Sequence, residues 1–239
     1  DEINFTAAGY VEGYVNDQFS MDEKDGCLRI ATTTYNWGAL TDDIATQTNH
    51  LFVLDESLKV IGSVNNFAND ESIRAVRFIG NKAYVITYEY VDPLFIIDLS
   101  DKANPKIEGS VEIDGFSSLL APVDENTLLG IGYSTYEGEY GMVTDGLKVV
   151  LFDISDPENP QVLDSEEFYN TTSDAQWNHK ALVQNGTKGY FALPISQSEY
   201  EYYETEDGYY DYRYYDYGNG VLVVEPNDGA LEFTQNMVD

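Results

Sequence analysis

Short runs of Val, Ile, Leu, Phe, Tyr and Thr recur along the chain, separated by the turn-forming residues Gly, Asn, Asp and Pro. Helical spacing of apolar residues is nearly absent, so this pattern predicts an all-β fold. The plainest group of runs is 73–79, 83–87, 93–99 and 106–113, with a tight turn at Gly80-Asn81 between the first two. Four consecutive strands joined by short connections predict one four-stranded antiparallel unit.

The same plan recurs elsewhere in the chain. The phrase DLSDKANP at 98–105 is repeated as DISDPENP at 153–160, each time after an apolar run. We predict a structural role for both phrases, because Asp, Ser and Asn side chains cap local backbone amides. Tandem four-stranded units are typical of the blades of a β-propeller. The predicted blades, all within one propeller segment 1–239, are 9–67, 71–113, 116–168 and 174–238.

A β-sandwich with many hairpins is the alternative, although a sandwich does not require the duplicated turn phrase. The first strand of the first blade is poorly defined within 13–23, and 179–184 is the predicted first strand of the last blade. Closed propellers have roughly four to eight blades. We therefore expect an incomplete arc of a larger propeller, which missing blades or a partner chain would complete.

Several phrases, in order, carry a resemblance to a known family. The strings are RIATTT at 29–34, VLDESLKVIGS at 53–63, IRAVRFIGNKAYVIT at 73–87, DPLFIIDLSDKANPK at 92–106 and LFDISDPENP at 151–160. They resemble the secreted bacterial β-propeller domain family, which is distantly similar to WD repeats. NHKALV at 178–183 resembles a later motif of that family, with Asn178 in place of an acid. The resemblance implies a secreted or cell-surface location and no particular reaction.

The net charge of the chain limits the kinds of partner that it can bind. There are 43 Asp and Glu residues against 12 Lys and Arg, a formal charge of −31. Nucleic acid is excluded as a direct partner because it requires clustered cations. No apolar run reaches the roughly 18 residues that a membrane span needs. Salt, calcium or a basic partner would offset the self-repulsion, and solubility alone is the simpler explanation.

The chain contains one cysteine, Cys27, and two histidines, His50 and His179. An internal disulfide is therefore impossible, and a tetrahedral zinc or iron site has too few ligands. Nothing around a serine or Cys27 resembles a nucleophile motif, which leaves paired carboxylates for glycoside cleavage as the remaining catalytic option.

Three long predicted loops share a position in the repeat. In a blade with strands a, b, c and d, the b–c connections and the d–a crossings emerge at the same end. The segments 36–47, 135–146 and 197–218 all join strands b and c, so we expect them on one face, with His50 nearby. Long loops on a rigid β scaffold commonly carry binding sites. The predicted ligand-binding residues on this face are Trp37, Tyr136, Tyr140, Trp177, Tyr209 and Tyr212.

The third loop is unusual in composition. Residues 199–218 read EYEYYETEDGYYDYRYYDYG, with nine tyrosines, seven carboxylates and Arg213. Flat rings beside carboxylates suit sugars, and they equally suit a cationic protein. A loop that closes over its own rings is the structural alternative. Calcium takes about six to eight oxygen ligands. The candidate calcium ligands are Asp207, Asp211 and Asp216, although no Asp-x-Asp-x-Asp-Gly loop is present.

Together these features predict a secreted or cell-surface recognition or scaffold module without catalytic activity. Its ligand, a glycan or a protein, would bind the acidic and aromatic b–c face. A glycan-active enzyme that uses two carboxylates is one alternative, and a structural surface spacer is another.

Overall fold

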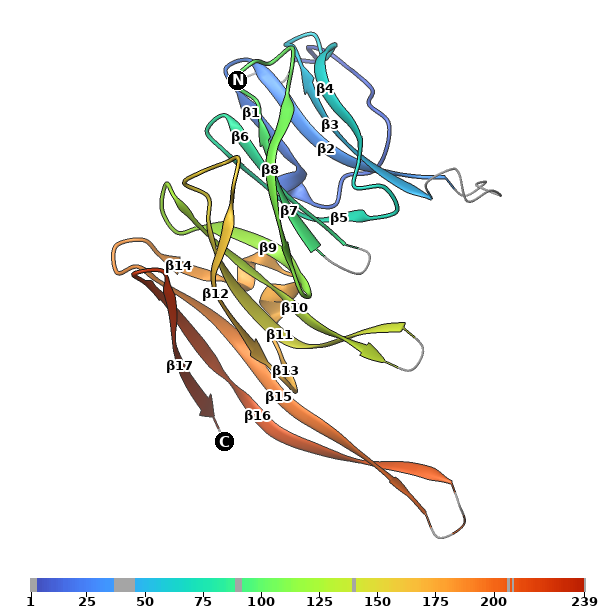
Figure 1. The fold of residues 1–239 in the computed structure, drawn as a ribbon, viewed down its shortest axis with the longest axis vertical. Coiled ribbons are helices and arrows are strands. Elements are labelled where there is room, and N and C mark those ends of the chain that lie inside the picture. The colour runs from blue at the N-terminus through green and yellow to red at the C-terminus, as the bar shows by residue number, and fades with distance from the viewer. Residues whose placement is uncertain are drawn as a thin grey trace. The chain divides into compact units, whose positions relative to one another are not determined.

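The computed structural model describes residues 4–36, 46–88, 92–138, 141–205, 207 and 209–238 (Figure 1). Strands dominate these residues and form four antiparallel sheets, in which strands consecutive in sequence are neighbours except β13 and β14, which both pair with β15. The predicted all-β fold with four four-stranded antiparallel units is therefore confirmed, with one additional short strand in the last sheet. None of the described helices is long and apolar enough to cross a membrane.

The first two sheets are regular meanders. Sheet A contains β1 (Met21–Lys24), β2 (Cys27–Tyr35), β3 (Gln47–Leu54) and β4 (Val60–Phe67). Sheet B contains β5 (Ser72–Ile79), β6 (Lys82–Tyr88), β7 (Asp92–Asp98) and β8 (Lys106–Ile113). A short 3-10 helix, η1 (Gln18–Ser20), precedes β1.

The other two sheets contain the longest strands. Sheet C contains β9 (Phe116–Pro122), β10 (Thr127–Gly138), β11 (Gly141–Asp153) and β12 (Gln161–Phe168). Sheet D contains β13 (Thr171–Thr172), β14 (Val183–Asn185), β15 (Tyr190–Glu204), β16 (Tyr210–Asn227) and β17 (Ala230–Val238). Two 3-10 helices, η2 (Asp174–Gln176) and η3 (His179–Ala181), lie between β13 and β14.

The chain divides into two compact units. Unit 1 comprises Asp1–Phe116 with Asp156–Pro160, and unit 2 comprises Ser117–Ser155 with Gln161–Asp239. Unit 1 holds sheets A and B, which pack together through one apolar cluster. Leu51 and Val53 of sheet A and Val85 and Ile97 of sheet B are fully buried in this cluster. Burying a side chain of this size contributes roughly 1.5–3 kcal/mol, so the shared core holds the two sheets together.

The repeated acidic turns cap their own backbone. The carboxylate of Asp55 accepts a hydrogen bond from Ser57 N at 2.9 Å, and that of Asp153 accepts one from Ser155 N at 2.8 Å. Asp98 accepts one from Ser100 N at 3.1 Å. These bonds confirm the structural role predicted for the duplicated phrases.

The fourth strand of one sheet meets the c–d turn of the next sheet within each unit. In unit 1 a Cβ at Gly62 of β4 would collide with the carbonyl oxygen of Lys102, so the close approach requires glycine. In unit 2 the Asp164 carboxylate of β12 accepts a hydrogen bond from Leu231 N of β17 at 2.7 Å. The same neighbour relation thus recurs in both units.

Two of the predicted loops are strands instead. β10 and β11 stay paired out to Gly138 and Gly141, and β15 and β16 stay paired out to Glu204 and Tyr210. The loop prediction for 135–146 and 197–218 is therefore wrong. In each hairpin the backbone groups that face the partner strand are paired in the ladder. Most of the remaining predicted loop, residues 37–45, lies outside the described residues.

The predicted strand at 179–184 is also wrong. His179–Ala181 forms η3, and only Val183–Asn185 pairs with β15. Side chains explain the difference, because Asn178 Oδ1 caps η3 by accepting from Lys180 N at 3.2 Å. Asn is a preferred cap residue and favours such turns over strands. The poorly defined first strand of the chain is β1, together with an isolated bridge between Tyr14 and Thr33.

Candidate functional site

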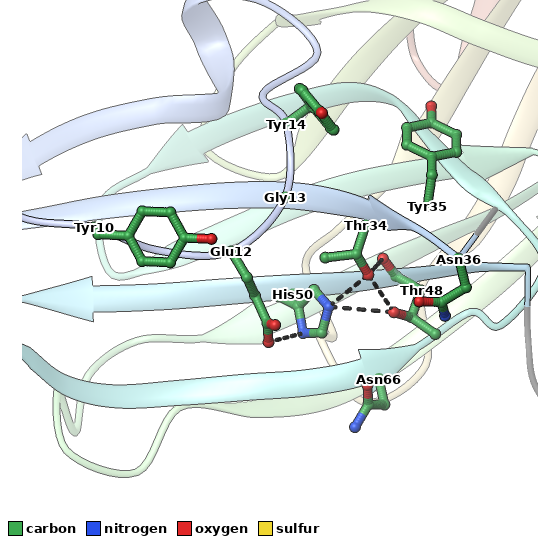
Figure 2. A pocket seen from close by; sticks show the side chains of 10 residues that line it. All are labelled: Tyr10, Glu12, Gly13, Tyr14, Thr34, Tyr35, Asn36, Thr48, His50 and Asn66. Carbon is green, nitrogen blue, oxygen red and sulfur yellow. Dashed lines mark hydrogen bonds and ion pairs between the residues drawn. The ribbon is translucent and has the colours of Figure 1, made fainter. Parts of the chain in front are cut away.

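An open hollow of about 790 Å3 lies at the b–c end of sheet A, where β2 ends and β3 begins (Figure 2). This volume is within the range of about 300–1,000 Å3 typical of small-ligand sites. Both strands and the segment before η1 contribute to its walls. The residues that line it are Tyr10, Glu12, Gly13, Tyr14, Thr34, Tyr35, Asn36, Thr48, His50 and Asn66.

The segment before η1 is fixed against β2. Tyr14 exchanges two backbone hydrogen bonds with Thr33, at 2.9 and 3.0 Å. Thr32 Oγ1 donates to the carbonyl oxygen of Glu12 at 2.8 Å. Gly13 has φ +94°, and a Cβ there would collide with Thr32 and Thr33. Glycine therefore allows this segment to cross β2 closely enough to present Glu12 and Tyr14 to the hollow.

His50 forms the base of the hollow and is almost completely buried. Its Nε2 atom lies 3.1 Å from the Thr34 hydroxyl and 3.2 Å from the Thr48 hydroxyl. Its Nδ1 atom lies 3.2 Å from Asn65 Oδ1 and 3.8 Å from a Glu12 carboxylate oxygen. Both neighbours of Nδ1 are acceptors, so Nδ1 carries a proton and Nε2 faces the two hydroxyls. The ring is thus held in one orientation, as Figure 2 shows.

A second buried polar side chain, Asn49, supports the wall behind His50. Asn49 is fully buried; its Oδ1 accepts from Thr33 Oγ1 at 2.7 Å. Its Nδ2 donates to the carbonyl oxygens of Phe67, Ala68 and Glu71, at 3.0–3.3 Å.

These bonds hold the connection between β4 and β5, whose backbone is unusual. Asn66, Ala68 and Asp70 all have positive φ, at 56°, 47° and 67°. Such conformations cost roughly 1–3 kcal/mol each for residues other than glycine and persist only where surrounding contacts enforce them. Asn66, the next-to-last residue of β4, lines the hollow directly before this connection. The strain is therefore stored beside the site, where it fixes one wall.

The lining of the hollow is polar but nearly uncharged. Glu12 is its one carboxylate and His50 its one imidazole, and no Lys or Arg is among the described residues that line it. The rings of Tyr14 and Tyr35 stand 6.2 Å apart and are tilted by 52°. Hydroxyl, amide and carboxylate groups beside aromatic rings can hold a ligand that has both hydroxyl groups and an apolar face.

The predicted ligand-binding residues that the structure describes, Tyr136, Trp177, Tyr209 and Tyr212, do not line this hollow. Trp37 and Tyr140 lie outside the described residues. Tyr136 lies on β10 opposite Val143, and Trp177 lies between η2 and η3; both side chains are exposed and belong to unit 2. Tyr209 and Tyr212 lie at the far end of the β15–β16 hairpin, also in unit 2.

Trp177 is held on a rigid support. Its neighbour Gln176 is buried, and the Gln176 amide donates to the carbonyl oxygens of Gly132 and Gly146 at 2.8 and 3.1 Å. Ser173 N donates to Gln176 Oε1 at 2.8 Å. The insertion that carries Trp177 is therefore anchored to sheet C, although the indole itself is 64% exposed.

The outer part of the β15–β16 hairpin, residues 198–205 and 209–216, is here termed the tyrosine ribbon. It begins at a bulge between Gln197 and Ser198. Tyr200 pairs with Tyr214, and Tyr202 pairs with Tyr212. Paired residues point to the same side of a two-stranded ribbon, so these tyrosines share one face.

The other face of the ribbon holds Glu199, Glu201, Asp211 and Arg213, together with Tyr203 and Tyr215. Glu201 faces Arg213 at 3.7 Å and accepts a hydrogen bond from the Tyr215 hydroxyl at 2.7 Å. Glu199 accepts one from the Tyr217 hydroxyl at 2.8 Å. These bonds to carboxylates raise the pKa of Tyr215 and of Tyr217 above the usual value for tyrosine. The first face, here termed the aromatic face, thus carries mainly tyrosines with Glu204 and Asp216 near its ends, whereas the second mixes tyrosines with charged groups.

The three candidate calcium ligands do not converge. Asp211 pairs with Tyr203 and Asp216 pairs with Ser198, which places them on opposite faces and near opposite ends of the ribbon. Asp207 lies in the turn between the strands. No group of three or more His, Cys, Asp or Glu side chains among the described residues could hold a metal ion.

The sequence predicted that His50 lies near the binding face, but it did not predict the residues that line the hollow around it. The signal was present as two polar runs, TTTY at 32–35 and QTNH at 47–50, which are adjacent in β2 and β3. Polar residues at inward positions of otherwise apolar strands indicate a buried network, and such networks are often tied to specificity or function. Tyr10 and Glu12 carried no comparable signal, because they precede the first regular strand.

Comparisons with known proteins give the family. The family described as "Beta propeller domain" matches residues 1–227. The chain is 40% identical over 190 residues to an uncharacterized protein of Archaeoglobus fulgidus, covering 80% of this chain and 28% of that protein. It is 37% identical over 194 residues to an uncharacterized protein of Methanocaldococcus jannaschii, covering 81% and 29%. The chain thus spans less than a third of the length of both relatives.

One solved structure is also similar. It is described as the X-ray structure of a hypothetical selenium-binding protein from Sulfolobus tokodaii. The match has a TM-score of 0.47 at 14% sequence identity, and it covers 87% of this chain and 51% of that one.

Proposed function

The chain belongs to the β-propeller domain family, and from this we propose that it is a non-catalytic recognition module that binds a neutral glycan in the hollow of unit 1. β-Propeller domains in general support a binding or scaffold role. The observation that carries the proposal is the buried His50, which two threonine hydroxyls hold in place at the base of a polar and aromatic hollow.

The chemistry of the lining supports a sugar. Sugar hydroxyls both donate and accept hydrogen bonds, as do the hydroxyl and amide groups around His50. Tyrosine rings offer faces on which the C–H side of a sugar stacks. A strongly anionic ligand is disfavoured, because Glu12 is in the lining and the chain carries a formal charge of −31.

The lining also favours recognition over hydrolysis. Most glycosidases use two carboxylates that flank the scissile bond. Among the described lining residues Glu12 is the one carboxylate, and it already faces the His50 ring. Glycan cleavage is the alternative function, and the product analysis in the experiment below tests it directly.

The experiment is isothermal titration of the chain with a panel of neutral oligosaccharides, with product analysis after each titration. We expect one binding site that is lost in Tyr14→Ala and weakened at least about tenfold in Glu12→Gln, which removes a charged hydrogen-bond partner without changing shape. The matched control is Tyr136→Ala, an exposed tyrosine of unit 2. The control should bind as the unmodified chain does.

Three results would contradict the proposal. They are the absence of binding to every sugar at millimolar concentration, binding that is unchanged by Tyr14→Ala, and release of a shorter glycan. The third result would replace recognition with catalysis.

We further propose a secreted or cell-surface location, which fits a glycan ligand. The resemblance to a secreted family supports it. Fractionation of cells that express the full-length protein tests this location, and recovery in the cytosolic fraction would contradict it.

A further inference from the structure

The tyrosine ribbon extends beyond the rest of sheet D. The last pairs of the neighbouring strands are Thr171 with Gln197 on one side and Val238 with Asn219 on the other. Among the described residues, no strand flanks residues 199–205 or 209–216, so both strand edges of the ribbon lack a partner strand there (Figure 1). An isolated two-stranded hairpin is only marginally stable in water, so an exposed ribbon of this length needs an explanation.

The aromatic face supplies part of the explanation. Tyr200 contacts Tyr212 and Tyr214, with ring centroids 5.6 and 5.0 Å apart, and Tyr202 contacts Tyr212 at 6.2 Å. Cross-strand aromatic pairs contribute to holding the strands together. Yet the tyrosines of this face, with Tyr210, remain 50–79% exposed, so the contacts between rings leave most of the face open.

The charge of the ribbon points to the kind of partner. Residues 199–218 carry seven carboxylates and Arg213 as the one cation. Arg213 is already used within the ribbon, where it faces Glu201 and lies 4.7 Å over the Tyr203 ring. The remaining carboxylates repel one another, and this repulsion opposes the compact hairpin.

We propose that the aromatic face of the tyrosine ribbon docks an extended, lysine- or arginine-rich polypeptide segment. Cations stack on tyrosine faces, and the nearby carboxylates attract them. The segment would lie along the ribbon, with alternate side chains directed at the rings. This surface lies in unit 2, and the proposal is independent of glycan binding in unit 1.

The other possible occupants fit less well. A second copy of the chain would bring two ribbons of the same strong negative charge together. A neutral glycan would stack on the rings but leave the repulsion among the carboxylates unrelieved. A basic segment satisfies both features, so salt dependence is the property that separates it from a glycan.

The test measures fluorescence anisotropy of a labelled peptide of about eight residues with alternating Lys and Ser, long enough to follow one strand of the ribbon at roughly 3.3 Å per residue. The full chain is titrated into the peptide at low salt. We expect saturable binding that weakens at least about tenfold when salt rises from about 50 to 500 mM. A Gln-Ser peptide of the same length serves as the neutral control and should not bind.

Two variants assign the binding to the rings. Tyr202→Ser with Tyr212→Ser should weaken binding about tenfold or more, because both central rings are lost. The same two positions changed to Phe keep the rings and should bind the peptide as the unmodified chain does, which assigns the effect to the rings and not to the hydroxyl groups. Circular dichroism of the Tyr→Ser double variant should match that of the unmodified chain, so that loss of the strands is not the cause. Glu112→Gln, at an exposed position of unit 1, is the control for loss of a charge elsewhere and should not change peptide binding.

Several results would overturn the proposal. They are equal binding by the Tyr→Ser double variant, equal binding of the neutral peptide, tighter binding of a neutral oligosaccharide to the same rings, and self-association that the Tyr→Ser variant abolishes. Saturable, salt-sensitive binding that requires the rings would support it.

Discussion

The hollow of unit 1 and the tyrosine ribbon of unit 2 both lie at the b–c ends of their sheets, but they are built in opposite ways. At the hollow, the polar side chains of His50 and of its neighbour Asn49 are buried and hydrogen-bonded to the groups around them. In the ribbon, the aromatic side chains are exposed and contact mainly their own neighbours. The hollow is thus part of the folded core of unit 1, whereas the ribbon is stabilised mainly by contacts between its own two strands.

Because of this difference, we expect substitutions at the two sites to affect different properties, the free energy of unfolding at the hollow and ligand affinity at the ribbon. Buried polar groups are costly to leave without partners, so substitutions at the hollow should destabilise unit 1. Substitutions in the ribbon remove little buried surface and should mainly change binding. The following predictions test this contrast, from the largest expected effect to the smallest.

The largest loss should follow Asn49→Leu. The change removes the amide nitrogen that donates to the carbonyl oxygens of Phe67, Ala68 and Glu71, and the amide oxygen that accepts from the Thr33 hydroxyl. We expect the free energy of unfolding to fall by about 3 kcal/mol or more, measured by urea denaturation. Asn227→Leu, at an exposed position, is the control and should change it by less than about 0.5 kcal/mol. Equal effects at the two positions would contradict the account of the strained connection.

Gln176→Ala should have an intermediate effect. The carbonyl oxygens of Gly132 and Gly146 lose their donor, which should cost about 1–3 kcal/mol. Trp177 fluorescence should also change, because its support is lost. Gln184→Ala removes an exposed amide that donates to Pro122 O and should have the smaller effect on stability. If the Trp177 emission did not respond to Gln176→Ala, the anchoring role of Gln176 would be wrong.

Tyr212→Ser in the ribbon should lower the free energy of unfolding by less than Gln176→Ala does. Its ring contacts Tyr200 and Tyr202 across the hairpin, and such pairs contribute about 0.2–1 kcal/mol. Urea denaturation should therefore show a decrease below about 1 kcal/mol. A loss as large as that of Asn49→Leu would mean that the ribbon is part of a core.

The smallest effect is expected at the acidic turns. Hydrogen bonds from Ser57 hold the pKa of Asp55 below its usual value, and those from Ser155 do the same for Asp153. A carboxyl whose pKa is lowered by folding contributes stability above its unfolded pKa, near 3.9, and this contribution is lost as the pH falls through the folded pKa. Ser57→Ala with Ser155→Ala should therefore lower stability slightly at neutral pH and reduce its further loss below about pH 4. An unchanged acid-denaturation curve would contradict this.

The repeat, the strand order and the capping role of the acidic turns follow from the sequence, because each depends on local signals. Period-two apolar runs mark strands, and Asp-x-Ser marks a capped turn. The tyrosine segment has the same period of two, but its density of charge favoured a loop interpretation. The extended pairing of Tyr200 with Tyr214 shows that cross-strand contacts outweigh that charge.

The hollow was not predictable in the same way. His50 and the threonines lie on strands that the sequence indicates, but the wall formed by Glu12 and Tyr14 depends on a segment without regular structure crossing β2. Such a contact joins residues far apart in sequence. No local pattern encodes it, apart from the glycine at position 13 that permits the crossing.

The most direct test of the central claim is NMR of the chain with labelled threonine methyl groups, titrated with a neutral oligosaccharide that binds. We expect the signals of Thr34 and Thr48, beside His50, to shift in proportion to occupancy, while that of Thr205, at the tip of the hairpin, stays in place. Shifts confined to Thr205, or to threonines distant from His50, would contradict the claim that the hollow of unit 1 is the glycan site.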